Sequence, residues 1–185
     1  HGTIIEGPCY IGKNTYISPN TLIRKNNTIG PMCKLGGEIT CCNILGFSNK
    51  VHDGFLGHSF IGEWVNIGAG TNNSNLKNNY GTVKVKFKDK VYDSELQFLG
   101  CLIGDYTRIS IGTNINTGSY IGLAVNLFNH DFLNNYVSSF SWGDNELVKI
   151  DLLLNTIQKM KARRTLKLSD IEKKMITDLY KKVTN

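Results

Sequence analysis

Large aliphatic residues recur at every sixth position in two stretches of the chain, and glycine often follows them directly. This spacing fits neither an amphipathic helix, whose apolar residues repeat about every 3.6 positions, nor a strand, whose side chains alternate. It fits a coil with three flat faces, in which each face turns one large side chain inward. The pattern therefore predicts a hexapeptide-repeat β-helix, whose inward side chains stack into ladders. The inward positions are Ile5, Ile11, Ile17, Ile23, Ile29, Leu35 and Cys41, and then Ile103, Ile109, Ile115, Ile121 and Leu127.

Between these two stretches the repeat continues with small irregularities. We extend it from Leu45 through Val51, Leu56, Ile61 and Ile67, with two intervals shortened to five residues. The coil is therefore expected to tighten between Val51 and Ile61. Functional residues often break the local rules of a fold, so we look for the site in this segment.

Residues 73–98 leave the repeat and are expected to form a hairpin that projects from the β-helix. Val83, Val85 and Phe87 alternate with lysines at positions 84, 86 and 88, which is the period of a strand with one basic face. Two interpretations stay open. The lysines either offer charge to a phosphate in the site of a neighbouring subunit, or they only keep an exposed sheet edge soluble.

The chain after residue 130 predicts a loop and two helices, which we expect to cover the open end of the solenoid. Ser169 and Glu172 have the spacing of a capping box, which marks the start of the second helix. The predicted organisation is a β-helix at 1–130, with the hairpin inserted at about 73–98, and a helical appendage at 131–185. The two apolar stripes are Leu147, Ile150, Leu154 and Ile157 in the first helix, and Ile171, Met175, Leu179 and Tyr180 in the second.

Charge and composition limit the partners of the chain. Its 185 residues carry a net charge of +6, and the basic residues gather in the hairpin and the C-terminal helices. No nucleic-acid-binding motif and no aromatic platform accompany the lysines, so we expect phosphate-bearing small molecules rather than nucleic acid. No apolar run reaches the roughly 18 residues that a membrane span requires.

The cysteines and asparagines fit a reduced, sharply cornered solenoid. The five cysteines include no CxxC pair, so a zinc site has little support, and we expect a cytoplasmic protein with free thiols. Many of the 21 asparagines fall between the inward positions, where a corner requires the left-handed backbone that asparagine tolerates. The chain begins with His1, and the repeat is in phase by Ile5, so we interpret the sequence as part of a longer protein.

Two segments are more specific than the repeat. Residues 52–71 read His-Asp-Gly-Phe-Leu-Gly-His-Ser-Phe-Ile-Gly-Glu-Trp-Val-Asn-Ile-Gly-Ala-Gly-Thr, and residues 75–85 read Asn-Leu-Lys-Asn-Asn-Tyr-Gly-Thr-Val-Lys-Val. They resemble the acetyltransferase domain of the bifunctional N-acetylglucosamine-1-phosphate uridylyltransferase and glucosamine-1-phosphate acetyltransferase family, and most closely a variant bacterial branch of sugar nucleotidyltransferases. The resemblance covers about residues 5–127. It implies a left-handed parallel β-helix, acetyl-CoA as co-substrate, acyl transfer without a metal, and a homotrimer with the CoA site between subunits.

The resemblance also implies roles for individual residues. His52 matches the general base of the family, and Glu38 matches an acidic residue near that base. Three phosphate-contact positions depart from the family: Thr40 and Gly81 stand where lysines contact the sugar phosphate, and Leu22 stands near a phosphate-binding arginine. The implied substrate-binding residues are Asn66, Asn75, Lys84, Phe55 (where the family has tyrosine) and Arg24 (two residues from Leu22), and the implied acyl-CoA contacts are Ala69 and Ile111.

Two functions stay open. The first is an acyl-CoA-dependent N-acetyltransferase acting on a glucosamine-1-phosphate-like amino-sugar phosphate or on a nucleotide amino-sugar. Histidine titrates near neutral pH, so His52 suits the proton transfer that this reaction needs, whereas His58 and His130 are interpreted as surface or packing residues. The second is a non-catalytic β-helix that trimerises or regulates a sugar-1-phosphate nucleotidylyltransferase whose catalytic domain lies outside these residues. No glycine-rich phosphate loop opens a helix here, so these residues cannot make a nucleotide sugar unaided.

Overall fold

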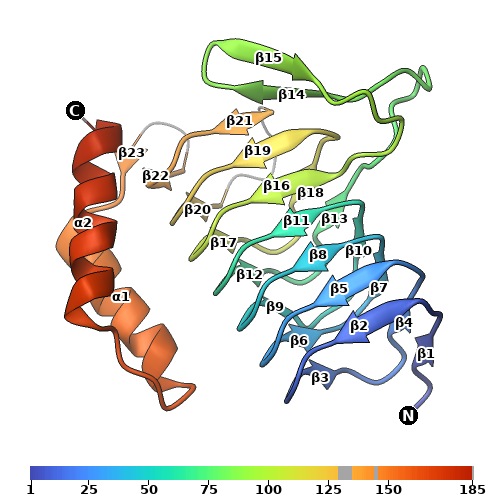
Figure 1. Cartoon of the computed structure of the whole chain (residues 1–185), viewed down its shortest axis with the longest axis horizontal. Helices are drawn as coiled ribbons and strands as arrows, with labels where there is room; N and C mark the ends of the chain where they lie inside the picture. The colour runs from blue at the N-terminus through green and yellow to red at the C-terminus, as the bar shows by residue number, and fades with distance from the viewer. Residues whose placement is uncertain (129–134, 144–145, 185) are drawn as a thin grey trace.

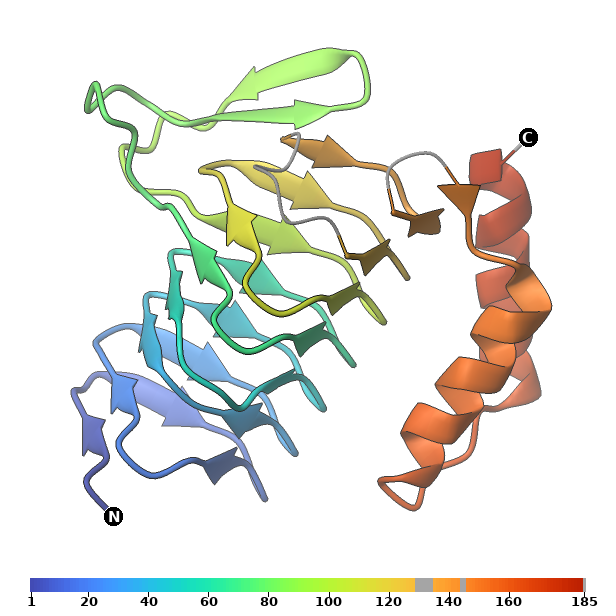
Figure 2. The ribbon, with the colours of Figure 1, turned by 180° about the vertical axis from the view of Figure 1, so that it is seen from behind.

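A computed structural model describes residues 1–128, 135–143 and 146–184 of the chain. The chain folds into the left-handed parallel β-helix that the resemblance implies, with an antiparallel hairpin and two helices (Figure 1). The coils stack from the N-terminus towards the hairpin end, and the helices run along one side of the stack (Figure 2). The predicted solenoid architecture is therefore confirmed. No helix in the described part of the chain is long and apolar enough to cross a bilayer.

Face B is a parallel sheet of seven strands. Its inward ladder passes in register from Ile11 to Ile29, Ile44, Ile61 and Ile103. The last strand follows residue 130, so the solenoid extends beyond the boundary that the sequence suggests. The strands are β2 (Cys9–Ile11), β5 (Asn27–Ile29), β8 (Asn43–Ile44), β11 (Phe60–Ile61), β16 (Cys101–Ile103), β19 (Ser119–Ile121) and β21 (Tyr136–Val137).

Face C follows face B in each coil and ends in one antiparallel strand. Its inward ladder contains Ile17, Leu35, Ile67 and Ile109, but a lysine occupies the position between Leu35 and Ile67. The strands are β3 (Tyr16–Ile17), β6 (Lys34–Leu35), β9 (Asn49–Lys50), β12 (Asn66–Ile67), β17 (Arg108–Ile109), β20 (Asn126–Leu127), β22 (Ser141–Trp142) and the antiparallel β23 (Glu146–Leu147).

Face A is interrupted where the site is expected. The backbone ladder stops after β10, and the Asn72 and Asn73 side chains replace it by accepting hydrogen bonds from the Phe55 and Gly57 N–H groups at 2.8 and 2.7 Å. Asn73 is buried at an inward position, where an aliphatic residue would make no such bond. The strands are β1 (Ile4–Ile5), β4 (Leu22–Ile23), β7 (Glu38–Thr40) and β10 (Phe55–Gly57), followed by the pair β13 (Asn72–Asn73) and β18 (Asn114–Ile115).

The structure corrects the predicted repeat in its middle section. Ile39 and Ile44 fill the core rather than Cys41 and Leu45, because the inward position advances by four residues after Leu35 and by five after Ile39. Gly36–Gly37 permits this short corner. Gly37 has a φ of +77°, and a Cβ at Gly36 would overlap the Val51 carbonyl group. The tightening therefore begins earlier than expected, and Lys50 takes the inward position that the sequence suggests for Val51.

The helices α1 (Ile150–Ala162) and α2 (Asp170–Thr184) pack along the side of the solenoid, so the expected cap over its open end is wrong. They cover the corner between faces B and C, where large side chains on a left-handed backbone point outward. The predicted capping box is confirmed, because the Ser169 and Glu172 side chains accept hydrogen bonds from each other's backbone N–H groups. The corner residues are Phe47, Trp64, Tyr106, Ala124 and Phe140, with φ values between +53° and +64°.

The predicted stripe of α1 is largely confirmed, because Ile150, Leu154 and Ile157 pack in the cluster that joins the helices to the solenoid, although Leu147 is exposed. Of the stripe predicted for α2, only Tyr180 packs there. Leu153 and Ile157 are buried in α1, as is Ile176 in α2. By contrast, Ile171 is 82% exposed, and Met175 and Leu179 are also exposed. Periodicity therefore located both helices correctly but chose the wrong side of α2.

The predicted hairpin is confirmed as β14 (Lys84–Phe87) paired antiparallel with β15 (Lys90–Asp93). It folds back over its own chain, because the Phe87 ring packs edge-on against Tyr120 and Tyr136 at centroid distances of 5.0 and 5.8 Å. Whether its lysines also serve a neighbouring subunit stays a prediction.

Candidate functional site

His52 lies at the corner between faces C and A, together with the two residues expected to contact acyl-CoA. His52, Ala69 and Ile111 occupy this corner in consecutive coils, and the Gly112 N–H group donates to the Ala69 carbonyl at 2.8 Å. His52 and Ile111 are exposed, the latter by 67%. Neighbouring strands of a sheet are about 4.8 Å apart, so one extended ligand can span the three coils along this corner.

A buried lysine holds the backbone of this corner. Lys50 is 2% exposed, and its ammonium group donates to the carbonyl oxygens of His52, Asp53 and Gly36 at 3.1, 3.0 and 3.3 Å. Burial lowers the pKa of Lys50 to about 8, because an apolar environment disfavours the charged form. The ammonium group replaces an aliphatic contact in the core with two hydrogen bonds to the loop that carries His52 and one to Gly36 in the preceding coil.

Face A brings three of the predicted residues together. Glu38 lies between Leu22 and Phe55 in the strand register, and its carboxylate accepts a hydrogen bond from Arg24 Nε at 2.6 Å. This pairing raises the pKa of the Arg24 guanidinium. In the described part of the chain no hydrogen bond joins Glu38 to the His52 ring, so the orienting role of Glu38 stays a prediction.

Asn75 lies at the far edge of face A and contacts a second histidine. Its amide lies 2.9 Å from His58 Nδ1, so a neutral His58 ring accepts this hydrogen bond. The Phe98 ring stacks on the His58 ring at a centroid distance of 5.2 Å. Burial lowers the pKa of His58, which favours the neutral acceptor form at physiological pH.

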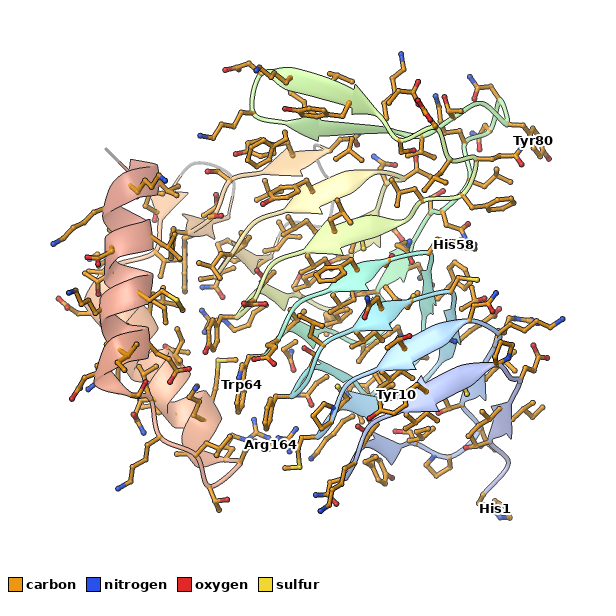
Figure 3. The ribbon with its side chains drawn as sticks, in the orientation of Figure 1. His1, Tyr10, His58, Trp64, Tyr80 and Arg164 are labelled. Atoms are coloured by element: carbon orange, nitrogen blue, oxygen red, sulfur yellow. The ribbon has the colours of Figure 1, made fainter. Side chains whose placement is uncertain are left out.

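The remaining substrate-binding predictions fall elsewhere. Asn66 is on the outer side of face C and lines a pocket beside α1, whereas Lys84 is exposed on the hairpin. Figure 3 shows His58 on the opposite side of the solenoid from Trp64 and Arg164, which mark the pocket beside α1.

His130 lies outside the described residues. In the described ranges no group of three or more His, Cys, Asp or Glu side chains could hold a metal ion.

Sequence reasoning missed Lys50 and His58 for different reasons. Lys50 was missed because the sequence pattern assigned the inward position to its neighbour Val51. Counting six residues from the inward Ile44 would have reached Lys50. His58 was missed because its stacking partner, Phe98, lies 40 residues later in the chain, at the end of the long insertion before β16.

In sequence, the chain is similar to proteins described as bifunctional nucleotidylyltransferase/acetyltransferases or as GlmU. A bifunctional sugar-1-phosphate nucleotidylyltransferase/acetyltransferase from Sulfurisphaera tokodaii is 36% identical over 117 residues, which are 63% of this chain and 28% of that protein. The bifunctional protein GlmU of Methanococcus maripaludis is 33% identical over 107 residues, covering 58% of this chain and 25% of the relative. The resemblance predicted from the sequence is confirmed.

A third relative gives the same result. The bifunctional protein GlmU of Methanococcus aeolicus is 32% identical over 122 residues, which are 63% of this chain and 28% of that protein. The chain thus spans about a quarter of the length of these curated relatives. No protein-family model matches the chain.

Proposed function

We propose that this chain is an acyl-CoA-dependent N-acetyltransferase for an amino-sugar phosphate or a nucleotide amino-sugar. The observation that carries the proposal is the exposed His52 at a corner shared with Ala69 and Ile111, in a β-helix similar to a named nucleotidylyltransferase/acetyltransferase. In the proposed reaction the substrate amine attacks the thioester carbonyl of acetyl-CoA. A carbon–nitrogen bond forms, the carbon–sulfur bond breaks, and coenzyme A leaves as the thiol.

His52 acts as the base in this reaction. Its ring takes a proton from the attacking amine, and the proton can then pass to the departing thiolate. Exposure at a corner gives the ring access to both substrates, while Lys50 fixes the backbone beneath it. The acyl-CoA is expected along Ala69 and Ile111, and the acceptor over Phe55 and Asn75 on face A.

The chain is expected to act as a homotrimer in the cytoplasm. Flat faces of parallel β-helices can pack side by side, and an acyl-CoA bound along an exposed corner would then lie between neighbouring prisms. Light scattering at micromolar concentration should give three times the mass of the chain. A monomer mass at this concentration would contradict the proposed assembly, because a monomer lacks the neighbouring subunit that would form one side of the acyl-CoA site.

A thiol-release assay tests the activity directly. Acetyl-CoA is mixed with the chain and a panel of amino-sugar phosphates and nucleotide amino-sugars, and at least one acceptor should release free coenzyme A and gain an acetyl group. Failure with every acceptor would favour the second function, a non-catalytic β-helix that trimerises or regulates a nucleotidylyltransferase domain. Two observations support that alternative. Glu38 pairs with Arg24, and the uncharged Thr40 and Gly81 stand where the resemblance implies lysines that contact the sugar phosphate.

A further inference from the structure

A basic pocket lies between face C and the C-terminal end of α1. Its volume is about 250 Å³. Figure 3 shows Trp64 and Arg164 in the space between the solenoid and the helices, where they line this pocket. The polar and aromatic lining includes Asn49, Asn66, Trp64, Arg108, Arg163 and Arg164.

The three arginines carry positive charge that the chain itself does not neutralise. Within 1–128, 135–143 and 146–184, none of them forms an ion pair with a carboxylate. Arg164 donates one hydrogen bond to the Asn49 side-chain oxygen at 3.0 Å, and its other donors stay available to a ligand. Three unneutralised guanidinium groups around one pocket favour an anion.

One buried donor of the pocket, on Arg108, and a second one on the neighbouring strand, on Asn126, also need an acceptor. The Nε atom of Arg108 and the Nδ2 atom of Asn126 are buried and have no hydrogen-bond partner among the described residues. These residues are neighbours in register on β17 and β20, with Asn66 on the other side of Arg108. Buried donors are nearly always paired in folded proteins, so a ligand with acceptor oxygens would complete this part of the structure.

Stabilisation of helix α1 explains only two of the three arginines that line the pocket. Arg163 and Arg164 follow the C-terminus of α1, where the helix dipole favours cations in any protein. Arg108 is on a strand of face C, and burial lowers the pKa of its guanidinium. Placing a charged group there without a counter-ion is unfavourable, so packing alone gives no reason for an arginine at this position.

We propose that this pocket binds the phosphate group of a phosphorylated small molecule. Arg108, Arg163 and Arg164 would donate to its oxygens, and the Asn66 amide and Trp64 ring would contact the attached organic group. A phosphate monoester carries about 1.5 to 2 negative charges near pH 7, which suits three guanidinium groups better than a single carboxylate would. This site does not depend on the proposed acyl transfer, because binding is measurable without turnover.

Trp64 provides the readout. Titrations with inorganic phosphate and with glucosamine-1-phosphate are followed by tryptophan fluorescence at low salt, in a Trp142→Phe background that leaves Trp64 as the remaining tryptophan. A saturable change is expected. Arg108→Met should weaken binding by about tenfold to a hundredfold, the range for losing a hydrogen bond to a charged group. Arg163→Gln, at an exposed position where folding is not at risk, should weaken it in the same direction.

Lys159→Gln is the matched control, because it removes one positive charge a turn earlier on α1 without touching the pocket. It should bind both probes as the parent does. The proposal is overturned if neither probe gives a saturable change, or if Lys159→Gln and both arginine variants weaken binding equally, which would indicate a general charge effect.

Discussion

The Lys50 ammonium group lies 3.1 Å from the carbonyl oxygen of His52 and so joins a core position of the solenoid to the proposed base. In a regular coil this position would hold an aliphatic side chain, as Leu35 and Ile67 do in the neighbouring coils. A buried lysine is unfavourable unless its donors are satisfied, and three backbone carbonyls satisfy them here. The corner that carries His52 is therefore fixed from the inside.

Lys50 gives stability a distinctive pH dependence. Its pKa falls from about 10.4 in the unfolded chain to about 8 in the folded one. Between these values the unfolded state binds more protons, so the contribution of Lys50 to stability rises with pH across this window. The free energy of unfolding of the parent, relative to that of Lys50→Met, should increase from pH 8 to pH 10 in denaturant titrations.

An exposed lysine provides the control for this experiment. Lys13→Met changes the same group at a solvent-accessible position, and its stability difference from the parent should stay nearly constant over the same pH range. Parallel behaviour of the Lys50 and Lys13 variants would show that Lys50 is not a buried cation.

His58 is expected to stay neutral at physiological pH. Burial lowers its pKa, and the Asn75 amide donates to its Nδ1 atom, a bond that protonation would break. Because its pKa is lower in the folded state, the contribution of His58 to stability falls as pH decreases below about 6.5. NMR titration of the ring should give a midpoint below about 6.5, and Asn75→Ala should move it upward. A midpoint at or above that of a free histidine would contradict this pairing.

The helices should stabilise the solenoid through one buried side. Ile157 is 0% exposed in the cluster that joins α1 to the B–C corner, so Ile157→Ala should lower the free energy of unfolding by about 2–5 kcal/mol. Ile171→Ala, at 82% exposure, should change it by less than about 0.5 kcal/mol. Urea unfolding compares the two, and equal losses would mean that α2 buries its Ile171 side instead.

The sequence predicts a feature well where the feature depends on residues close together in the chain. Ile5 to Leu35 and Ile103 to Leu127 were placed correctly because every coil there takes the same number of residues. In the middle coils Leu56, Ile61 and Ile67 were also placed correctly in the core. Cys41, Leu45 and Val51 were not, since the short Gly36–Gly37 corner changes the count and only contacts between coils reveal it. Lys50 was missed for the same reason.

The site was predictable only as a set of separate residues. The family resemblance singled out His52, Phe55 and Asn75 as candidate site residues, but which side chains pair with one another depends on the three-dimensional arrangement. Glu38 binds Arg24 from the preceding coil, and Asn75 binds His58, which the sequence offered no reason to single out. The place where the helices pack on the solenoid also could not be predicted, because an amphipathic stripe does not show which surface will cover it.

The most direct test of the proposed function is the turnover of His52→Ala on an acceptor identified by the thiol-release panel, measured beside His1→Ala as a second exposed histidine. The variant should keep the melting temperature and assembly of the parent, because the His52 ring is exposed and its backbone is held by Lys50. Loss of a positioned base should lower turnover by about a hundredfold to ten-thousandfold, while His1→Ala stays unchanged. Parental turnover in a folded His52→Ala protein would contradict the account.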